Sequence, residues 1–330
     1  MADDILTIGD TEIAPGERKT INLPVARLYT NNWTYMPVTV VRGKKPGPKL
    51  FICAAQHGDE INGVEMIRRL LKNTHLEKIK GSLIAIPVVN VFGFIHSSRY
   101  LPDRRDLNRS YPGSKRGSLA SRLAHLFIEE VASNATHGID IHTAAVHRYN
   151  LPQIRANLND PETLDMAKAF GTPVIVHSRQ RNNSLRETLA EMDMPIIVYE
   201  GGEALRFNEP VIKYGVKGVI RVMRHLGMLR RTKASAPEPV QTEKTRWVRA
   251  KQSGLLHLRV KAGARVKQHQ VIATITDPLG NAFVELKSPF DGVIIGHTNL
   301  PLVNAGDAAI HVAKVKVYQE IEEELDQLEE

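Results

Sequence analysis

The sequence predicts an α/β protein in which a sheet flanked by helices precedes a small all-β domain, a barrel or a sandwich. Three observations support this prediction. From Lys49 to about Gly227, short apolar runs alternate with segments of helical periodicity, a pattern typical of a mostly parallel sheet. Residues 230–244, RRTKASAPEPVQTEK, are polar and lack any periodicity. From Trp247 to Val317 the chain consists of short β-type runs separated by turn signals.

The first region contains strand and helix signals in alternation. Apolar runs predict strands at residues 38–41, 50–54, 82–88, 138–141, 174–176 and 196–199. Helical spacing predicts helices at residues 61–72, 118–132, 161–170, 184–192 and 209–226. We therefore expect a large domain at residues 1–235, a linker at 236–246, a β domain at 247–318 and an acidic tail at 319–330.

The C-terminal β segment resembles the biotinyl/lipoyl carrier fold, notably in the run SPFDGV at residues 288–293. In such carriers a modified lysine lies on a hairpin about seven residues before this run, but Leu279, Gly280 and Asn281 occupy that neighbourhood here. Lys287 directly precedes the run, on a predicted strand. We therefore expect a structural relative of the carriers that lacks the swinging arm, which argues against a carrier function.

Composition narrows the class of protein. The 330 residues are 42% hydrophobic and 24% charged, and no apolar run approaches the roughly 18 to 20 residues of a membrane span. The N-terminus lacks the basic and apolar regions of a secretory signal, so we expect a soluble, cytoplasmic protein without a membrane partner. A single cysteine, Cys53, excludes an intrachain disulfide and a cysteine-based zinc cluster. Any metal would therefore be held by His, Asp and Glu.

The net charge of +8 is unevenly distributed, because residues 320–330 carry seven acids and no base. A basic body can indicate nucleic-acid binding, but aromatic residues make up only 5% and the bases are scattered. We expect no nucleic-acid partner and instead a small anionic substrate, which such a field attracts. A homo-oligomer is compatible with the sequence.

Two histidines and a glutamate lie at predicted strand ends. His57 and Glu60 are three residues apart where a strand gives way to a helix, and His142 ends another strand at the same edge of the sheet. Two His and one Glu plus a water form the open tetrahedral arrangement of catalytic zinc. The alternative is that these histidines are hydrogen-bonded core residues.

Two further polar features lie on this edge. Arg99 and the loop at residues 100–109 together contain four arginines and Asn108, after a predicted strand. Glu200 closes the strand at 196–199 just before two glycines, which allow close backbone approach. A carboxylate in this position is a candidate general base, although a surface Glu at a strand end is the alternative.

The blocks HGDE, SRY, DLNR, DIHT and VYEGG, within roughly residues 38–227, resemble the succinylglutamate desuccinylase/aspartoacylase family of the zinc carboxypeptidase superfamily. The resemblance implies a mixed, zinc-carboxypeptidase-like sheet and one zinc ion per chain on His57, Glu60 and His142. It also gives roles to other residues: Glu200 as general base and then acid, Asn108 and Arg109 as ligands of the substrate carboxylate, Arg99 as the group that polarises the scissile carbonyl, and Asp106 as the group that orients His57. The segment between Arg99 and Asp106 is two residues longer than expected, which makes Arg99 the least secure of these assignments.

The resemblance therefore implies a zinc-dependent amidohydrolase that deacylates an N-acyl amino acid by attack of a zinc-bound water. A carboxypeptidase-like enzyme that cuts small peptides would use the same metal site and is the alternative. Arg179, Arg181, Arg186 and His147 are candidates for the specificity pocket, although each is of a type more often found solvated on the surface.

Overall fold

The computed structural model describes residues 5–179, 181–232, 238–281 and 283–315, so the expected acidic tail at 319–330 lies outside the described residues. The helices are α1 (Asn62–Leu70), α2 (Val91–Ile95), α3 (Leu119–Glu130), α4 (Pro161–Phe170), α5 (Leu185–Glu191) and α6 (Glu209–His225), with short 3-10 helices η1 (Thr74–Lys78), η2 (Leu107–Arg109) and η3 (Ala132–Asn134). No helix of the described ranges has the length and hydropathy required to span a membrane.

Ten strands precede α6 in the chain. They are β1 (Leu6–Ile8), β2 (Thr11–Ile13), β3 (Arg18–Arg27), β4 (Trp33–Arg42), β5 (Lys45–Ala54), β6 (Lys80–Ile86), β7 (His137–Ala144), β8 (Arg148–Ala156), β9 (Val174–His177) and β10 (Ile196–Glu203). Nine follow α6: β11 (Val240–Thr242), β12 (Thr245–Arg249), β13 (Gly254–Leu258), β14 (Arg265–Val266), β15 (Val271–Thr276), β16 (Phe283–Lys287), β17 (Gly292–Thr298), β18 (Leu302–Val303) and β19 (Ala308–Lys314).

Each strand and helix predicted between residues 38 and 226 has a counterpart in the structure, with shifts of a few residues at the ends. Local capping explains several helix boundaries. The side chain of Ser118 accepts the backbone N–H of Ser121 at the start of α3, and Asp160 accepts that of Thr163 at the start of α4. Gly171 ends α4 in the left-handed conformation, with φ of +80°. The sequence did not predict β1, β2, β3, β8 and α2.

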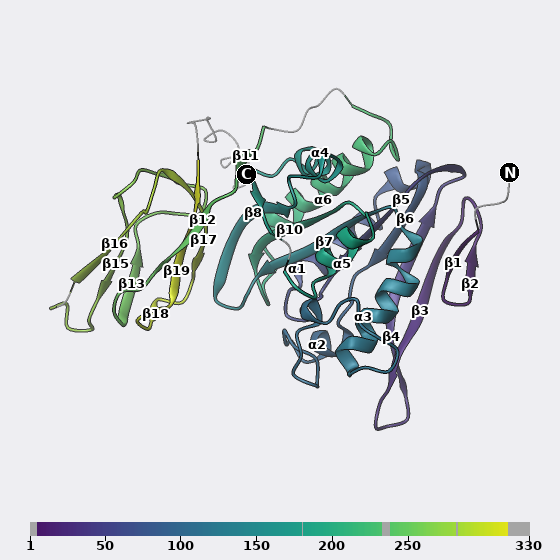
Figure 1. Cartoon of the computed structure of the whole chain (residues 1–330), viewed down its shortest axis with the longest axis horizontal. Coiled ribbons are helices and arrows are strands. Elements are labelled where there is room, and N and C mark those ends of the chain that lie inside the picture. Colours follow the sequence, from purple (N-terminus) through teal and green to yellow (C-terminus); the bar gives the residue numbers. More distant parts are fainter. Residues whose placement is uncertain (1–4, 180, 233–237, 282, 316–330) are drawn as a thin grey trace.

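A 13-stranded mixed sheet dominates the molecule (Figure 1), with the main order β12-β19-β17-β8-β10-β7-β5-β6-β4-β3. Its centre, β10-β7-β5-β6, is parallel, whereas β8 and β4 flank that centre in antiparallel orientation. The expectation of a mostly parallel sheet therefore applies to the centre and to the pairs β8-β9 and β9-β11, and the sheet as a whole is mixed.

Helices cover both faces of this sheet. Phe51 and Cys53 of β5 lie in a core shared with α3 and α5, whereas Leu50 and Ile52 lie in a second core shared with α1, α4 and α6. Because successive side chains of a strand point to opposite faces, a strand covered on both faces is apolar throughout. This explains the uninterrupted apolar run that predicted β5.

The strands after α6 extend the same sheet. Strand β17 pairs with β8, and β19 and β12 continue beyond it, at the left of Figure 1. Strands β16, β15, β13 and β18 form a separate four-stranded sheet, and a third apolar core lies between the two layers. The expected linker at 236–246 contains β11, because residues 240–242 pair in parallel with β9. The domain limits themselves stay a prediction, as does the likeness of the β segment to the biotinyl/lipoyl fold.

Candidate active site

His57, Glu60 and His142 meet at the carboxyl edge of the parallel strands. His57 and Glu60 lie in the turn between β5 and α1, and His142 lies on β7, the parallel neighbour of β5. Gly58 holds this turn against α2: an added Cβ there would lie 1.9 Å from the backbone carbon of Gly93, so no larger residue fits. Fold and sequence thus bring three residues of metal-binding types, two histidines and a glutamate, to one place.

The three side chains form a compact, buried cluster. Nδ1 of His57 lies 2.7 Å from Oε1 of Glu60, and Nδ1 of His142 lies 2.7 Å from Oε2 of the same carboxylate. One ligand atom from each residue lies within 4.8 Å of the other two. Both histidines therefore present the same ring nitrogen, Nδ1, toward the glutamate.

The opposite nitrogen of each histidine faces a second carboxylate. Nε2 of His57 lies 3.1 Å from Oδ1 of Asp106, and Nε2 of His142 lies 2.8 Å from Oδ2 of Asp140. A carboxylate behind a histidine holds the proton on the outer nitrogen and leaves the lone pair of the inner nitrogen for a metal. Sequence reasoning assigned Asp106 to this task and missed Asp140. The sequence did contain a signal for Asp140, because it lies two residues before His142 in a predicted strand and residues two apart in a strand share a face.

The electrostatics of the cluster favour added positive charge. Burial alone would lower the pKa of His57, but the charge of Glu60 and hydrogen bonding with Asp106 outweigh burial and raise it. Burial likewise opposes protonation of His142, whose pKa is nevertheless raised well above the usual range by Asp140 and Glu60. A site that favours protons on both rings also favours a divalent cation that replaces them, so this donor set fits zinc.

Arg99 lies beside the cluster despite the longer segment that follows it. Its Nη1 lies 3.3 Å from Nδ1 of His57 and 3.5 Å from Oε1 of Glu60, and its Nη2 donates to Oδ2 of Asp106 at 2.9 Å. The guanidinium is thus near the ligand atoms and fixed by the carboxylate that also contacts His57.

Glu200 lies next to His142, since the two residues are opposite each other in the neighbouring parallel strands β10 and β7. Its Oε2 accepts a hydrogen bond from Nδ2 of Asn150 at 2.6 Å, and its Oε1 lies 3.0 Å from Nε of Arg155. Both partners come from β8, a strand that the sequence did not predict. The carboxylate is therefore held in a defined position beside the histidine cluster.

Asn108 and Arg109 lie in η2, which follows Asp106. The Oδ1 atom of Asn108 accepts the backbone N–H of Leu185 at 3.0 Å, which ties the loop to the start of α5. The guanidinium of Arg109 donates to the backbone oxygen of Asn108. Burial lowers the pKa of Arg109; the charge of Asp106 opposes this effect, and the positive charges of Arg181 and Arg99 reinforce it. Such a cation is suited to an anionic ligand.

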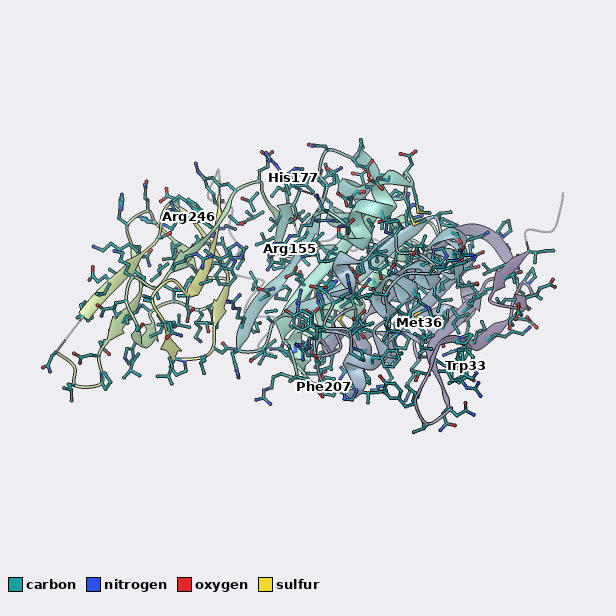
Figure 2. All side chains as sticks on the ribbon, turned by 60° about the horizontal axis from the view of Figure 1, so that its bottom comes forward. Trp33, Met36, Arg155, His177, Phe207 and Arg246 are labelled. Carbon is teal, nitrogen blue, oxygen red and sulfur yellow. The ribbon has the colours of Figure 1, made fainter. Side chains whose placement is uncertain are left out.

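One cavity of about 400 Å³ is lined by His57, Glu60, Arg99, Asn108, Arg109, Asp140, His142, Asn150, Arg155 and Glu200, whereas Asp106 does not line it. Acidic residues of this lining, Glu60, Asp140 and Glu200, are each engaged by the contacts described above. Six arginines also line the cavity: Arg99, Arg109, Arg148, Arg155, Arg181 and Arg186. Figure 2 shows Arg155 in the sheet, with Arg246 of β12 in the C-terminal strands.

Arg186 is the most deeply buried of these cations, with 9% of its surface exposed. Its Nη2 donates to the Ser178 hydroxyl at 3.1 Å and to the backbone oxygen of Arg179 at 2.8 Å. Its Nη1 is buried and has no hydrogen-bond partner among the described residues. Burial lowers the pKa of Arg186 to about 10. Of the four pocket candidates from the sequence, Arg181 and Arg186 line the cavity and Arg179 and His147 do not.

Comparisons with known proteins identify the family of the chain. A family model described as the succinylglutamate desuccinylase/aspartoacylase catalytic domain matches residues 46–226. Over 295 residues, 85% of this chain and 86% of the relative, the chain is 28% identical to the N-alpha-acetyl-L-2,4-diaminobutyric acid deacetylase of Halomonas elongata.

Solved structures show a similar fold. The succinylglutamate desuccinylase/aspartoacylase of Rhodobacter sphaeroides superimposes with a TM-score of 0.79 at 25% identity, over 90% of this chain and 96% of that one. The product-bound ectoine utilization protein EutE (DoeB) of Ruegeria pomeroyi superimposes with a TM-score of 0.80 at 24% identity, over 92% of this chain and 98% of that one. At 24% identity, the similarity to the Ruegeria pomeroyi protein concerns the fold alone.

Proposed function

Because the chain belongs to the succinylglutamate desuccinylase/aspartoacylase family, we propose that it is a zinc-dependent amidohydrolase that removes the acyl group from an N-acyl amino acid. The observation that carries this proposal is the buried His57, Glu60 and His142 cluster, with a carboxylate behind each histidine and Glu200 alongside. The deacetylase relative supports removal of an acyl group from an amino acid over the cutting of small peptides.

His57, Glu60 and His142 would hold one zinc ion per chain. Zinc in such a site polarises the scissile carbonyl and lowers the pKa of water to about 7. Asp106 and Asp140 keep the two imidazoles in the tautomer and orientation that a metal needs.

Glu200 acts as the general base and then as the general acid. Its carboxylate accepts a proton from the attacking water and returns it to the nitrogen of the leaving amino acid. The contacts of Glu200 with Asn150 and Arg155 keep the carboxylate oriented for both transfers. Arg99, whose guanidinium lies close to Glu60, is placed to stabilise the oxyanion that develops on the scissile carbonyl.

The substrate carboxylate binds to Asn108 and Arg109. Arginine suits this role because its planar guanidinium donates two parallel hydrogen bonds to a carboxylate. Arg186 supplies a further donor, since this residue lines the same cavity and its buried Nη1 has no partner among the described residues. An N-acyl amino acid, which is small and anionic, fits both the charge and the size of this cavity. The cytoplasmic location and a homo-oligomeric state stay predictions from the sequence.

The test is hydrolysis of a panel of N-acetyl, N-succinyl and other N-acyl amino acids beside dipeptides, by protein loaded with one equivalent of zinc. We expect at least one N-acyl amino acid to be cleaved with kcat/KM of about 10⁴ M⁻¹ s⁻¹ or more, and His142→Ala to lose both bound zinc and turnover. Cleavage of dipeptides alone, or stoichiometric zinc retained by His142→Ala, would contradict the proposal.

A further inference from the structure

One row of residues crosses the sheet from the C-terminal strands to the catalytic residues. Trp247 of β12 lies opposite His311 of β19, and His311 lies opposite Gly296 of β17. Gly296 in turn lies opposite Asn150 of β8, whose side chain holds Glu200. Residues directly opposite each other on adjacent strands share a face of the sheet. Trp247 and His311 therefore belong to the same surface as the residue that positions the proposed general base.

His311 has the features of a ligand-contacting residue. It lines the active-site cavity, only 3% of its surface is exposed, and its side chain makes no hydrogen bond within the described residues. Its ring stacks on Trp247 with centroids 4.6 Å apart and an interplanar angle of 9°. The guanidinium of Arg148 lies over the same indole, 5.4 Å from its centroid. Buried polar side chains without a hydrogen bond are uncommon, and a cavity-lining position accounts for this one.

The imidazole of His311 is neutral at physiological pH. Burial, with the nearby charge of Arg155, lowers its pKa to about 3. A neutral imidazole carries one N–H and one lone pair. Nδ1 is buried without a partner, and a buried lone pair is tolerated better than a buried N–H, so the proton belongs on Nε2. The positive charges of Arg148 and Arg155 disfavour an ammonium group here and favour an oxygen acceptor.

Gly296 allows Asn150 and His311 to flank it closely. A Cβ at this position would lie 2.8 Å from Oδ1 of Asn150 and 2.9 Å from the backbone oxygen of Tyr149, so a larger residue would displace the side chain that holds Glu200. His311 and Asn150 are two strands apart, which corresponds to about 10 Å. An extended chain of roughly three residues covers that distance. An acylated amino acid with an extended acyl group or side chain approaches that length.

We propose that Trp247 and His311 form the distal end of the substrate site, where His311 donates its N–H to an oxygen at the substrate end remote from the scissile bond. This inference rests on the proposed deacylase function and concerns its specificity. The oxygen can belong to the acyl group or to the amino-acid side chain, and both sources share the same chemistry. The C-terminal strands thereby take part in substrate selection.

Two pairs of substrates test the proposal, each comparing an oxygen-bearing end with an apolar end of the same shape. The acyl pair is N-succinyl against N-(4-methylpentanoyl) on the amino acid that the panel identifies. The side-chain pair is N-acetylglutamate against N-acetylhomoleucine. The variant is His311→Phe, which keeps a ring against Trp247 but has no N–H. The matched control is His297→Phe, since His297 also stacks on a ring, that of Tyr149, but does not line the cavity.

We expect the wild type to prefer the oxygen-bearing member of at least one pair, and His311→Phe to reduce that preference in kcat/KM by about ten- to a hundredfold. His297→Phe should retain the preference. No preference in either pair, or an equal loss of kcat/KM for both members in His311→Phe, would overturn the inference while the deacylase function stands. If no N-acyl amino acid is cleaved by the wild type, the proposed function itself fails.

A second measurement does not depend on the folding of His311→Phe. In Glu200→Gln protein labelled with ¹⁵N-histidine, addition of the preferred oxygen-bearing substrate should shift the Nε2 resonance of His311. Binding of that substrate without a shift of this resonance would also overturn the inference.

Discussion

Replacement of Asp140 by asparagine tests whether the carboxylate behind His142 supports metal binding. Oδ2 of Asp140 lies 2.8 Å from Nε2 of His142, and Oδ1 accepts a weak hydrogen bond from the Cys53 thiol, with a sulfur-to-oxygen distance of 3.3 Å. The side chain of Asp140 is 2% exposed, compared with 16% for Asp106 behind His57. Asparagine preserves the shape and one acceptor oxygen but removes the negative charge.

The expected loss follows from the hydrogen bond that changes. A hydrogen bond with a charged partner contributes about 1.5 to 3 kcal/mol and a neutral one about 0.5 to 1.5 kcal/mol, so Asp140→Asn should weaken support of His142 by about 1 to 1.5 kcal/mol. This corresponds to an increase of about tenfold in the Kd for zinc. Replacement of a residue that hydrogen-bonds a metal ligand typically weakens metal affinity by roughly 10- to 100-fold, so about 100-fold is the upper limit for the increase in Kd. Because solvent screens Asp106 more, Asp106→Asn should have the smaller effect.

The assay is competition for zinc between the protein and a chromogenic chelator at pH 7. The control is Asp165→Asn, which removes an exposed carboxylate from α4 and should leave the Kd unchanged. A Kd for Asp140→Asn within twofold of the wild-type value would refute the argument. So would a larger effect of Asp106→Asn than of Asp140→Asn.

Three further predictions follow from the site. Glu200→Gln should keep zinc but lower kcat by about 10²- to 10⁴-fold, because the amide cannot transfer a proton; a nearly normal kcat would identify another base. Arg109→Lys should lower kcat/KM for free-acid substrates by about ten- to a hundredfold and barely affect amide-capped ones; equal use of both kinds by the wild type would exclude carboxylate recognition by Arg109. Because the pKa values of His57 and His142 are raised, protons compete with zinc at lower pH. The Kd for zinc should therefore rise as pH falls below these pKa values, by up to about 100-fold per pH unit for two protons, and a Kd independent of pH would contradict the two-histidine site.

The residues that sequence reasoning identified lie in short segments at the ends of parallel strands. His57, Glu60, His142 and Glu200 follow apolar runs that are buried on both faces, and such runs are recognisable one at a time. Parallel strands bring their carboxyl ends to one edge regardless of their order, so the cluster could be predicted without the topology. This is why the candidate metal site needed only local patterns.

Other residues of the cavity could not be predicted because they depend on long-range pairing. Asn150 contacts Glu200 from β8, whose sequence RYNLPQIRA contains Pro152 and lacks a clear alternating pattern. His311 joins the cavity wall only because β19 pairs with β17 and β17 with β8. Neither relationship leaves a signal within a short window of sequence.

The polar stretch before Trp247 marks a change of composition but does not interrupt the sheet. Strand β17 covers residues 148–150 of β8, and β11 covers the outer edge of β9. Without these strands, the edge of β8 that carries Asn150 would lose its backbone partners, and an unpaired edge is prone to local opening. Since Asn150 holds the Glu200 carboxylate, the C-terminal strands support the proposed general base as well as the distal wall of the cavity. The β segment, which has no lysine at the position that is modified in biotinyl/lipoyl carriers, therefore has a structural role beside this site.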